Sequence, residues 1–251
     1  MDEKSRFSKL HEHYVAGRPG YPPQLIDILR NRYCLSPATM VADLGSGTGK
    51  LTELFLYAGC TVHCVEPNDD MRLAAETRFS GEINFRSIPA SAEHTGLDND
   101  TIDLITAGQA FHWFDVDRTR KEALRILRSG GIAAIVWNDR DRTGSDFARD
   151  YETLLMEQCP AYRTTPHQDR DTNRLVRFFG QESFHTDRIP HAQPYTAATL
   201  SSLLQSTTYL PKEKPTRSEV LHELDEIFRR HESGGQVEMH YETMMYSGKV
   251  L

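Results

Sequence analysis

The sequence predicts an α/β fold in which a mostly parallel, doubly wound sheet carries helices on both faces. Short apolar runs alternate with stretches of helical periodicity through the first 137 residues. The first apolar run ends in a glycine-rich turn, as expected where a strand passes directly into a helix. The polar region that follows shows no strand pattern of its own. These observations predict one sheet domain with an added helical cap.

The alternating part begins with a helix and continues with five strands. Pro22 or Pro23 suits the first turn of the opening helix, which ends near Arg32. Strands that alternate with helices pair in parallel and are covered on both faces, so they form a single sheet. The predicted strands are residues 40–44, 61–65, 83–87, 102–106 and 131–137, and the helices between them are residues 50–57, 69–78 and 118–127.

The pattern changes after Trp137. Residues 139–180 are polar and rich in Arg, Asp and Thr, and we expect them to form a cap together with residues 1–21. Two late strands are predicted at about residues 183–189 and 237–246. Helices are predicted between these strands at residues 197–205 and 218–231. The whole chain, residues 1–251, is therefore predicted to be one domain with cap elements.

Composition limits the partners that we expect. The formal net charge is -7 and the isoelectric point is near 5.9, so the chain would repel a phosphate backbone, and we expect no nucleic acid partner. No apolar run is long enough to cross a bilayer, and the first residues lack the apolar core of a secretory signal. The four cysteines form no C-x-x-C pair and no zinc-site spacing. We expect a cytoplasmic protein without a metal ion.

The segment that tells most about function is the glycine turn that follows the first strand, D-L-G-S-G-T-G-K at residues 43–50. A nucleotide P-loop would need a glycine at position 44 and Ser or Thr at position 51, and both positions hold leucine. A dinucleotide site would need its third glycine where Lys50 stands. The acid Asp43 would oppose a pyrophosphate, whereas S-adenosylmethionine carries no phosphate and has a cationic end. The turn therefore favours S-adenosylmethionine.

A second acid follows the second strand. Glu66 lies about 20 residues after the turn, where a carboxylate is able to accept both hydroxyls of a ribose. An acid at this place suits NAD as well, so Glu66 supports a nucleoside ligand without choosing between the two.

Several motifs resemble those of class I S-adenosylmethionine-dependent methyltransferases, of the broad methyltransferase-11 type that includes aconitate-methyltransferase-like enzymes. The motifs are V-A-D-L-G-S-G-T-G at residues 41–49, V-E-P-N at residues 65–68 and A-G-Q-A-F-H-W-F-D at residues 107–115, with R-F-S at residues 6–8 and Y-x-x-x-R-P-x-Y-P at residues 14–22. The resemblance covers about the first 140 residues well and the remainder loosely. It implies a Rossmann-like sheet of seven strands with one antiparallel member near the end.

The resemblance also implies which residues bind the cofactor. The first loop would surround the methionine portion, Glu66 would hold the ribose, and Pro67 and Met71 would line the adenine. At residues 91–93, Ser91 stands where the family commonly has an aspartate. The full set of expected cofactor contacts is Asp43, Gly45, Ser46, Gly47, Glu66, Pro67, Met71, Ala92, Glu93, Ala107 and Gln109, with Tyr14 and Arg18 from a segment that folds over the cofactor.

The resemblance implies methyl transfer to oxygen, nitrogen or carbon of a small acceptor. His112 and Trp113 would line the acceptor pocket, and His112 would take a proton if the acceptor is a hydroxyl or an amine. Two alternatives remain open at this point. One is an NAD(P)-dependent oxidoreductase, although the third glycine and a catalytic pair are missing. The other is a non-catalytic ligand-binding protein with the same fold.

Overall fold

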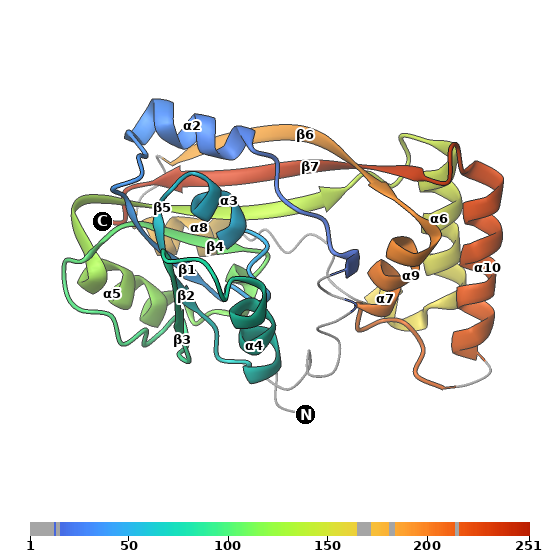
Figure 1. Cartoon of the computed structure of the whole chain (residues 1–251), viewed down its shortest axis with the longest axis horizontal. Helices are drawn as coiled ribbons and strands as arrows, with labels where there is room; N and C mark the ends of the chain where they lie inside the picture. Colours follow the sequence, from blue (N-terminus) through green and yellow to red (C-terminus); the bar gives the residue numbers. More distant parts are fainter. Residues whose placement is uncertain (1–12, 14–15, 165–171, 181–183, 214–215) are drawn as a thin grey trace.

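The sheet in the computed structural model has seven strands in the order β3-β2-β1-β4-β5-β7-β6 (Figure 1). The structure describes residue 13 and residues 16–164, 172–180, 184–213 and 216–251. All neighbouring strands pair in parallel except β7, which is antiparallel to both β5 and β6. The predicted Rossmann-like sheet with one antiparallel member is confirmed. The strands are β1 (Met40–Leu44), β2 (Thr61–Val65), β3 (Phe85–Ile88), β4 (Ile102–Gly108), β5 (Leu127–Arg140), β6 (His185–Tyr195) and β7 (Val237–Gly248).

The helices follow the predicted alternation. Two predicted ranges, residues 69–78 and 197–205, coincide with helices of the structure. The other four predicted helices differ from the observed bounds by a few residues, and three of the helices that the structure describes lie in the cap range, for which no bounds were predicted. The helices are α2 (Gln24–Tyr33), α3 (Thr52–Tyr57), α4 (Asp69–Arg78), α5 (Val116–Ile126), α6 (Asp146–Gln158), α7 (Pro160–Thr164), α8 (Thr172–Phe179), α9 (Ala197–Gln205) and α10 (Thr216–His231), with a short 3₁₀ helix η2 at Phe111–Trp113.

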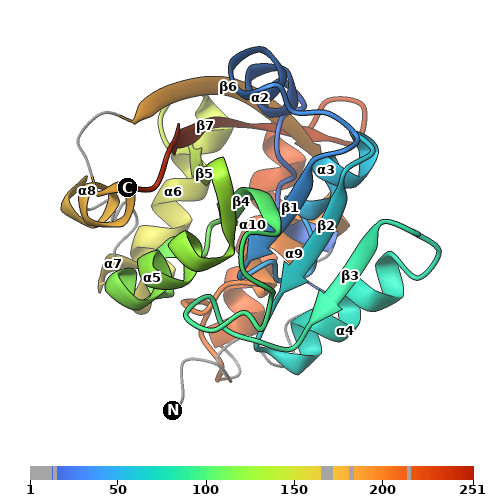
Figure 2. The same cartoon turned by 90° about the vertical axis from the view of Figure 1, so that its left-hand side faces the viewer.

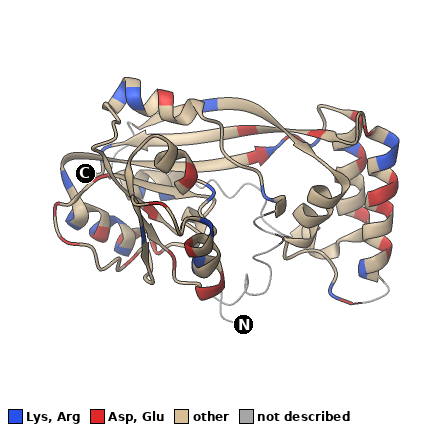
Figure 3. Cartoon of the chain, in the orientation of Figure 1, with Lys and Arg blue, Asp and Glu red and all other residues tan. Residues whose placement is uncertain are grey.

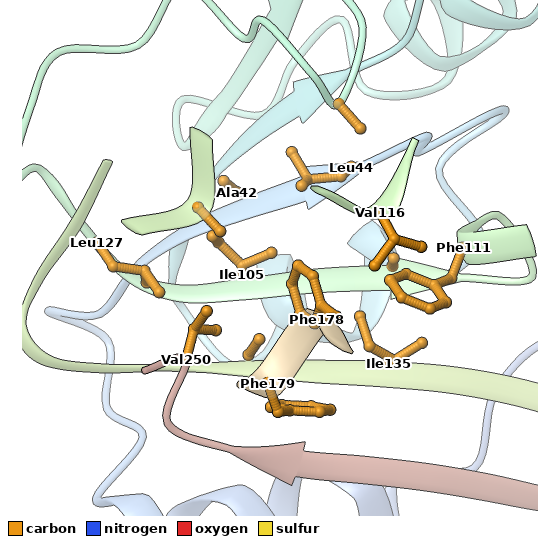
Figure 4. Close-up of a cluster of buried hydrophobic side chains, with 14 of the residues drawn as sticks. Ala42, Leu44, Ile105, Phe111, Val116, Leu127, Ile135, Phe178, Phe179 and Val250 are labelled. Carbon is orange, nitrogen blue, oxygen red and sulfur yellow. The ribbon is translucent and has the colours of Figure 1, made fainter. Parts of the chain in front are cut away.

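Helices cover both faces of the sheet (Figure 2), and each face has its own apolar core. On one face, Leu25 of α2 and Phe55 of α3 pack on the strands, and we call this set the α2–α3 core. On the opposite face, Val116 of α5 and Phe178 of α8 pack with residues of β4 and β5 (Figure 4). We call this second set the α5–α8 core. Burial of one such large side chain contributes about 1.5–3 kcal/mol to stability. Packing on both faces therefore holds the strands in place.

The helices α6, α7, α9 and α10 form a separate group, here called the helical cluster, at the far end of the long strands β6 and β7 (Figure 1). Its apolar core includes Tyr151, Leu155, Leu204 and Phe228. The predicted cap range, residues 139–180, is therefore divided between two places. Helices α6 and α7 belong to the cluster, whereas α8 packs against α5 on the sheet. Helices α9 and α10, predicted only as connections between the late strands, build much of the cluster.

The outer surface of the helical cluster mixes both signs of charge (Figure 3). On α10, Arg229 pairs with Asp225, and Arg230 pairs with Asp150 of α6 at 2.7 Å. The side chains of these pairs are exposed, so this face of the cluster is in contact with solvent. Among the residues that the structure describes, no helix has both the length and the apolar character that crossing a membrane requires.

Candidate functional site

The glycine turn after β1 is held in the left-handed region of backbone space. The φ angles of Gly45, Gly47 and Gly49 are +64°, +57° and +79°, where side chains are strained. A Cβ on Gly45 would lie 2.7 Å from Cβ of Ala110, and a Cβ on Gly49 would lie 2.3 Å from the ring of Phe79. A Cβ on Gly47 would meet nothing within 4 Å. Gly45 and Gly49 therefore permit close packing, whereas the main chain at Gly47 faces open space.

The carboxylate of Glu66 lies directly beside this open glycine. Its Oε2 accepts a hydrogen bond of 2.9 Å from the backbone N–H of Gly47, and its Oε1 accepts one of 2.8 Å from the N–H of Asn68. The residue is only 8% exposed. Burial raises the pKa of Glu66, and the two backbone hydrogen bonds oppose this rise. Each oxygen keeps acceptor capacity beyond the bond that it already makes.

A cavity of about 220 Å³ opens between these groups and the carboxyl end of β4. Ligands of α/β proteins bind at this end of a parallel sheet. The wall is mainly apolar, with Glu66 and Glu93 as its acids. The lining residues are Gly45, Gly47, Glu66, Pro67, Asn68, Met71, Ser91, Ala92, Glu93, Gly108, Gln109, Ala110, Trp113 and Phe114.

Nine of the residues predicted for the site line this cavity: Gly45, Gly47, Glu66, Pro67, Met71, Ala92, Glu93, Gln109 and Trp113. Ala107 lies beneath it, fully buried in the α5–α8 core. His112 is exposed and is not among the lining residues; its ring lies 4.7 Å from that of Trp113. Tyr14 lies outside the described residues. Arg18 reaches the helical cluster, where its Nη2 donates to the carbonyl of Ser206 at 3.2 Å.

The structure places Asp43 under the turn. Its side chain is fully buried and accepts hydrogen bonds from the hydroxyls of Thr52, at 2.6 Å, and Thr106, at 3.0 Å. Burial raises the pKa of Asp43 to about 6. Asp43 and Ser46 border a smaller hollow of about 30 Å³ on the β1 side of the turn. Asp43 therefore ties β1 to α3 and β4, which fixes the base of the glycine turn.

Gln109 has a strained backbone at the cavity wall. Its φ is +55°, which is uncommon for a residue other than glycine. Its backbone N–H donates to the carbonyl of Val136 at 2.9 Å, and its side-chain Nε2 donates to the carbonyl of Asn138 at 2.8 Å. Such strain persists where the surroundings fix it, and it is concentrated at functional sites. Here the two hydrogen bonds to β5 hold Gln109 in this conformation.

Five lining residues were not assigned to the site from the sequence: Asn68, Ser91, Gly108, Ala110 and Phe114. A signal existed for Asn68, because an asparagine before two acids at a helix start is a typical N-cap. Its side chain accepts a hydrogen bond of 3.0 Å from the N–H of Met71. No local signal separates Ala110 and Phe114 from core residues. Within the described part of the chain, no three His, Cys, Asp or Glu side chains gather as a metal site.

The strand order, the antiparallel β7 and the glycine turn define the class I methyltransferase fold. The structure is similar to that of a "Putative Type II Methyltransferase" from Anaeromyxobacter dehalogenans, with a TM-score of 0.65 at 21% identity, covering 93% of this chain and 98% of that one. It is also similar to geranyl diphosphate methyltransferase in complex with S-adenosylmethionine, with a TM-score of 0.51 at 12% identity, covering 96% of this chain and 95% of that chain.

Sequence comparison leads to the same family. A profile of the methyltransferase domain matches residues 42–135. The uncharacterized methyltransferase Rv3342 of Mycobacterium tuberculosis is 38% identical over 128 residues, which is 51% of this chain and about half (50%) of that relative's length. The uncharacterized methyltransferase C25B8.09 of Schizosaccharomyces pombe is 27% identical over 94% of this chain and 93% of its own. Residues 42–135 therefore resemble a methyltransferase domain, and these relatives and solved structures are all named as methyltransferases.

Proposed function

We propose that this chain binds S-adenosylmethionine in the cavity beside Glu66 and transfers its methyl group to a small acceptor molecule. The observation that carries the proposal is the buried carboxylate of Glu66, 2.9 Å from the N–H of Gly47, an open left-handed glycine at an apolar cavity. Glu66 suits the ribose of NAD as well, but Lys50 stands where a dinucleotide turn needs its third glycine. A cationic nucleoside without phosphate suits Glu66, because the carboxylate oxygens are able to accept the ribose hydroxyls.

The remaining walls fit the parts of such a ligand. Pro67, Met71 and Ala92 offer apolar surface to a planar base. The main chain at Gly47 leaves room for an extended methionine arm, since no side chain fills that space. The acceptor would enter on the side of Gln109 and Trp113, which line the part of the cavity formed by the end of β4.

The chemistry requires little of any single side chain. When bound, S-adenosylmethionine supplies a methyl group that is already electrophilic. The chain has to align the acceptor atom with this group and exclude water, which contributes several kcal/mol to catalysis. His112 lies outside the cavity lining, with its ring 4.7 Å from that of Trp113, so it is the proposed base only for a hydroxyl or amine acceptor that extends past Trp113. A carboxylate acceptor needs no base. A cytoplasmic location remains a prediction from the sequence.

Calorimetry of the full chain with S-adenosylmethionine, S-adenosylhomocysteine and NADH tests the proposal. We expect saturable binding of the first two and none of NADH. Folded protein that binds neither thioether nucleoside would contradict the proposal, and NADH binding in their place would indicate an oxidoreductase. A screen of carboxylic acids, phenols and amines, read out as S-adenosylhomocysteine formed, then tests methyl transfer. Binding without product across that screen would favour a non-catalytic ligand-binding protein.

A further inference from the structure

A short N-terminal segment joins the helical cluster to the carboxyl end of β4. We call residues 17–21 the strap. At its start, Gly17 is buried, and a Cβ there would lie 2.1 Å from the backbone nitrogen of Leu203 in α9. At its end, the hydroxyl of Tyr21 would lie 2.6 Å from a Cβ on Gly108. The strap therefore contacts α9 at one end and the strand that leads into the cavity wall at the other.

The middle of the strap is held at one peptide position from two sides. The carbonyl of Gly20 accepts a hydrogen bond of 2.8 Å from Nδ2 of Asn138 in β5. The N–H of Gly20 donates to Oε1 of Gln193 in β6 at 3.0 Å. These two strands flank β7, so the strap crosses the sheet where its strands leave the α2–α3 core. Its position is set by side chains of β5 and β6.

The amide of Asn138 has a defined orientation. Its Oδ1 accepts a hydrogen bond of 2.5 Å from the hydroxyl of Thr243, which is fully buried in β7. A threonine hydroxyl has one hydrogen, so the contact of 3.2 Å between Thr243 Oγ1 and Nδ1 of His191 is donated by the histidine. The chain of donors therefore runs from His191 through Thr243 to Asn138. This chain turns Nδ2 of Asn138 toward Gly20.

The main chain of Asn138 reaches the cavity wall as well. Its carbonyl accepts the side-chain hydrogen bond of Gln109, which holds that residue in its strained backbone conformation. One residue thus contacts the strap through its side chain and the cavity wall through its backbone.

We propose that Asn138 is a positioning residue of the methyl-transfer site, whose side-chain amide holds the strap in a fixed place. Tyr21 is thereby kept against Gly108 of the cavity wall, and Arg18 against the helical cluster. This inference rests on the proposed function for the activity of the site, but the hydrogen bonds that it invokes do not. Asn138 acts through the strap and has no assigned contact with cofactor or acceptor. Replacing its side chain leaves the backbone bond to Gln109 in place.

The N–H of Gly20 donates to Gln193, so its exchange rate, measured by NMR, reports how firmly the strap is held when the separate bond from Asn138 to the Gly20 carbonyl is removed. Asn138→Asp keeps the shape and the oxygen that faces Thr243, but it replaces the donor to Gly20 with a second acceptor. We expect exchange to become about tenfold faster, as for the loss of one hydrogen bond of about 1.4 kcal/mol. Asn84→Asp is the matched control, since Nδ2 of Asn84 donates to the carbonyl of Gly59 far from the strap. Equal exchange at Gly20 in both variants would overturn the proposal.

Two substitutions of Thr243 separate positioning from packing. Thr243→Ser keeps the hydroxyl and loses a methyl group, whereas Thr243→Val keeps the shape and loses the hydroxyl. We expect the serine variant to protect Gly20 within about twofold of the unchanged protein, and the valine variant to lose protection several-fold. The opposite order would mean that Thr243 and Asn138 only fill space, which would disprove the directional chain.

Binding and turnover test the link to function. The residues that line the cavity do not include the strap, so Asn138→Asp should bind S-adenosylhomocysteine within about threefold of the unchanged protein. With an acceptor found in the screen above, kcat should fall about tenfold to 100-fold. An unchanged kcat would overturn the positioning role. If the unchanged protein does not bind S-adenosylhomocysteine at all, the proposed function fails, while the exchange rates still decide whether Asn138 holds the strap.

Discussion

The sheet region and the helical cluster use buried charge in different ways. Under the glycine turn, Asp43 is buried with two threonine hydroxyls, and no Lys or Arg in the described part of the chain forms an ion pair with it. In the cluster, the guanidinium of Arg140 pairs with Glu152, contacts the hydroxyl of Tyr162 at 3.1 Å and lies 4.8 Å from the ring centre of Tyr151. A buried carboxylate without a cation has a raised pKa and takes up a proton near neutral pH, whereas a guanidinium paired with an acid stays charged. The contribution of Asp43 to stability should therefore depend on pH, and that of the Arg140 pair should depend on the presence of both partners.

Removing the guanidinium of Arg140 should have the largest effect on stability. Arg140→Ala leaves the half-buried Glu152 without its cation, although the hydroxyl of Tyr162 still donates to it, so we expect a loss of about 3 kcal/mol in the free energy of unfolding. Urea titration measures this loss. Arg128→Ala is the matched control, because Arg128 is 46% exposed in its pair with Asp103 and should lose about 1 kcal/mol or less. Similar losses in the two variants would remove the contrast between buried and exposed pairs.

Asp43 provides the pH-dependent counterpart. Its pKa in the folded state, about 6, lies above the ordinary value of 3.8, so the folded chain binds this proton more tightly than the unfolded chain does. The stability that it contributes is therefore complete below about pH 4 and is lost as the pH rises through 6. The difference in unfolding free energy between the unchanged protein and Asp43→Asn should fall by about 2.5 kcal/mol between about pH 4 and pH 7. A difference independent of pH would show that Asp43 stays ionised.

Glu66 should show its effect in ligand binding. Glu66→Ala removes the proposed ribose acceptor, so the affinity for S-adenosylhomocysteine should fall about 10-fold to 100-fold, corresponding to about 1.5–3 kcal/mol. Glu219→Ala, at an exposed position of α10, removes the same charge from the helical cluster and should leave affinity unchanged. Calorimetry on both variants makes the comparison. Unchanged affinity in Glu66→Ala would remove the ribose assignment.

Two helix caps give the smallest expected effect. Asn68 caps α4 at the cavity, and Ser145 caps α6 in the cluster, each by accepting a backbone N–H. Asn68→Ala and Ser145→Ala should each cost about 1 kcal/mol of stability. Only Asn68→Ala should also weaken S-adenosylhomocysteine binding, by about threefold. Equal binding in the two variants would mean that the cap does not help to shape the cavity.

The sequence predicted the sheet region better than the cluster for a physical reason. The glycine turn carries a local signal, since a left-handed backbone needs glycine, and Glu66 carries one through its spacing of about 20 residues from that turn. The range of α4 was predicted correctly because its cap and its periodicity are both local. The length of β5, from Leu127 to Arg140, was underestimated because its last residues pair with β7, about 100 residues away in the chain.

The division of the predicted cap had the same cause. The apolar stripe of α8, Leu175, Phe178 and Phe179, fits a sheet or a helical bundle equally well, and only its contact with α5 decides between them. Asn138 also carried no signal, because its role depends on Gly20 and Thr243, each more than 100 residues distant. Turns, helix caps and periodicity are visible in a single sequence, whereas contacts between residues far apart in the chain are not.

The long strands β6 and β7 each contribute side chains to two apolar cores. Ile189 of β6 and Met245 of β7 pack in the α2–α3 core, whereas Tyr195 and Tyr241 of the same strands pack in the helical cluster. The backbone hydrogen bonds between these strands continue from one core to the other. Neither core is therefore able to melt without breaking the ladder that supports its neighbour. The protein should denature on heating as one cooperative unit, with a single calorimetric peak whose enthalpy equals the van't Hoff value.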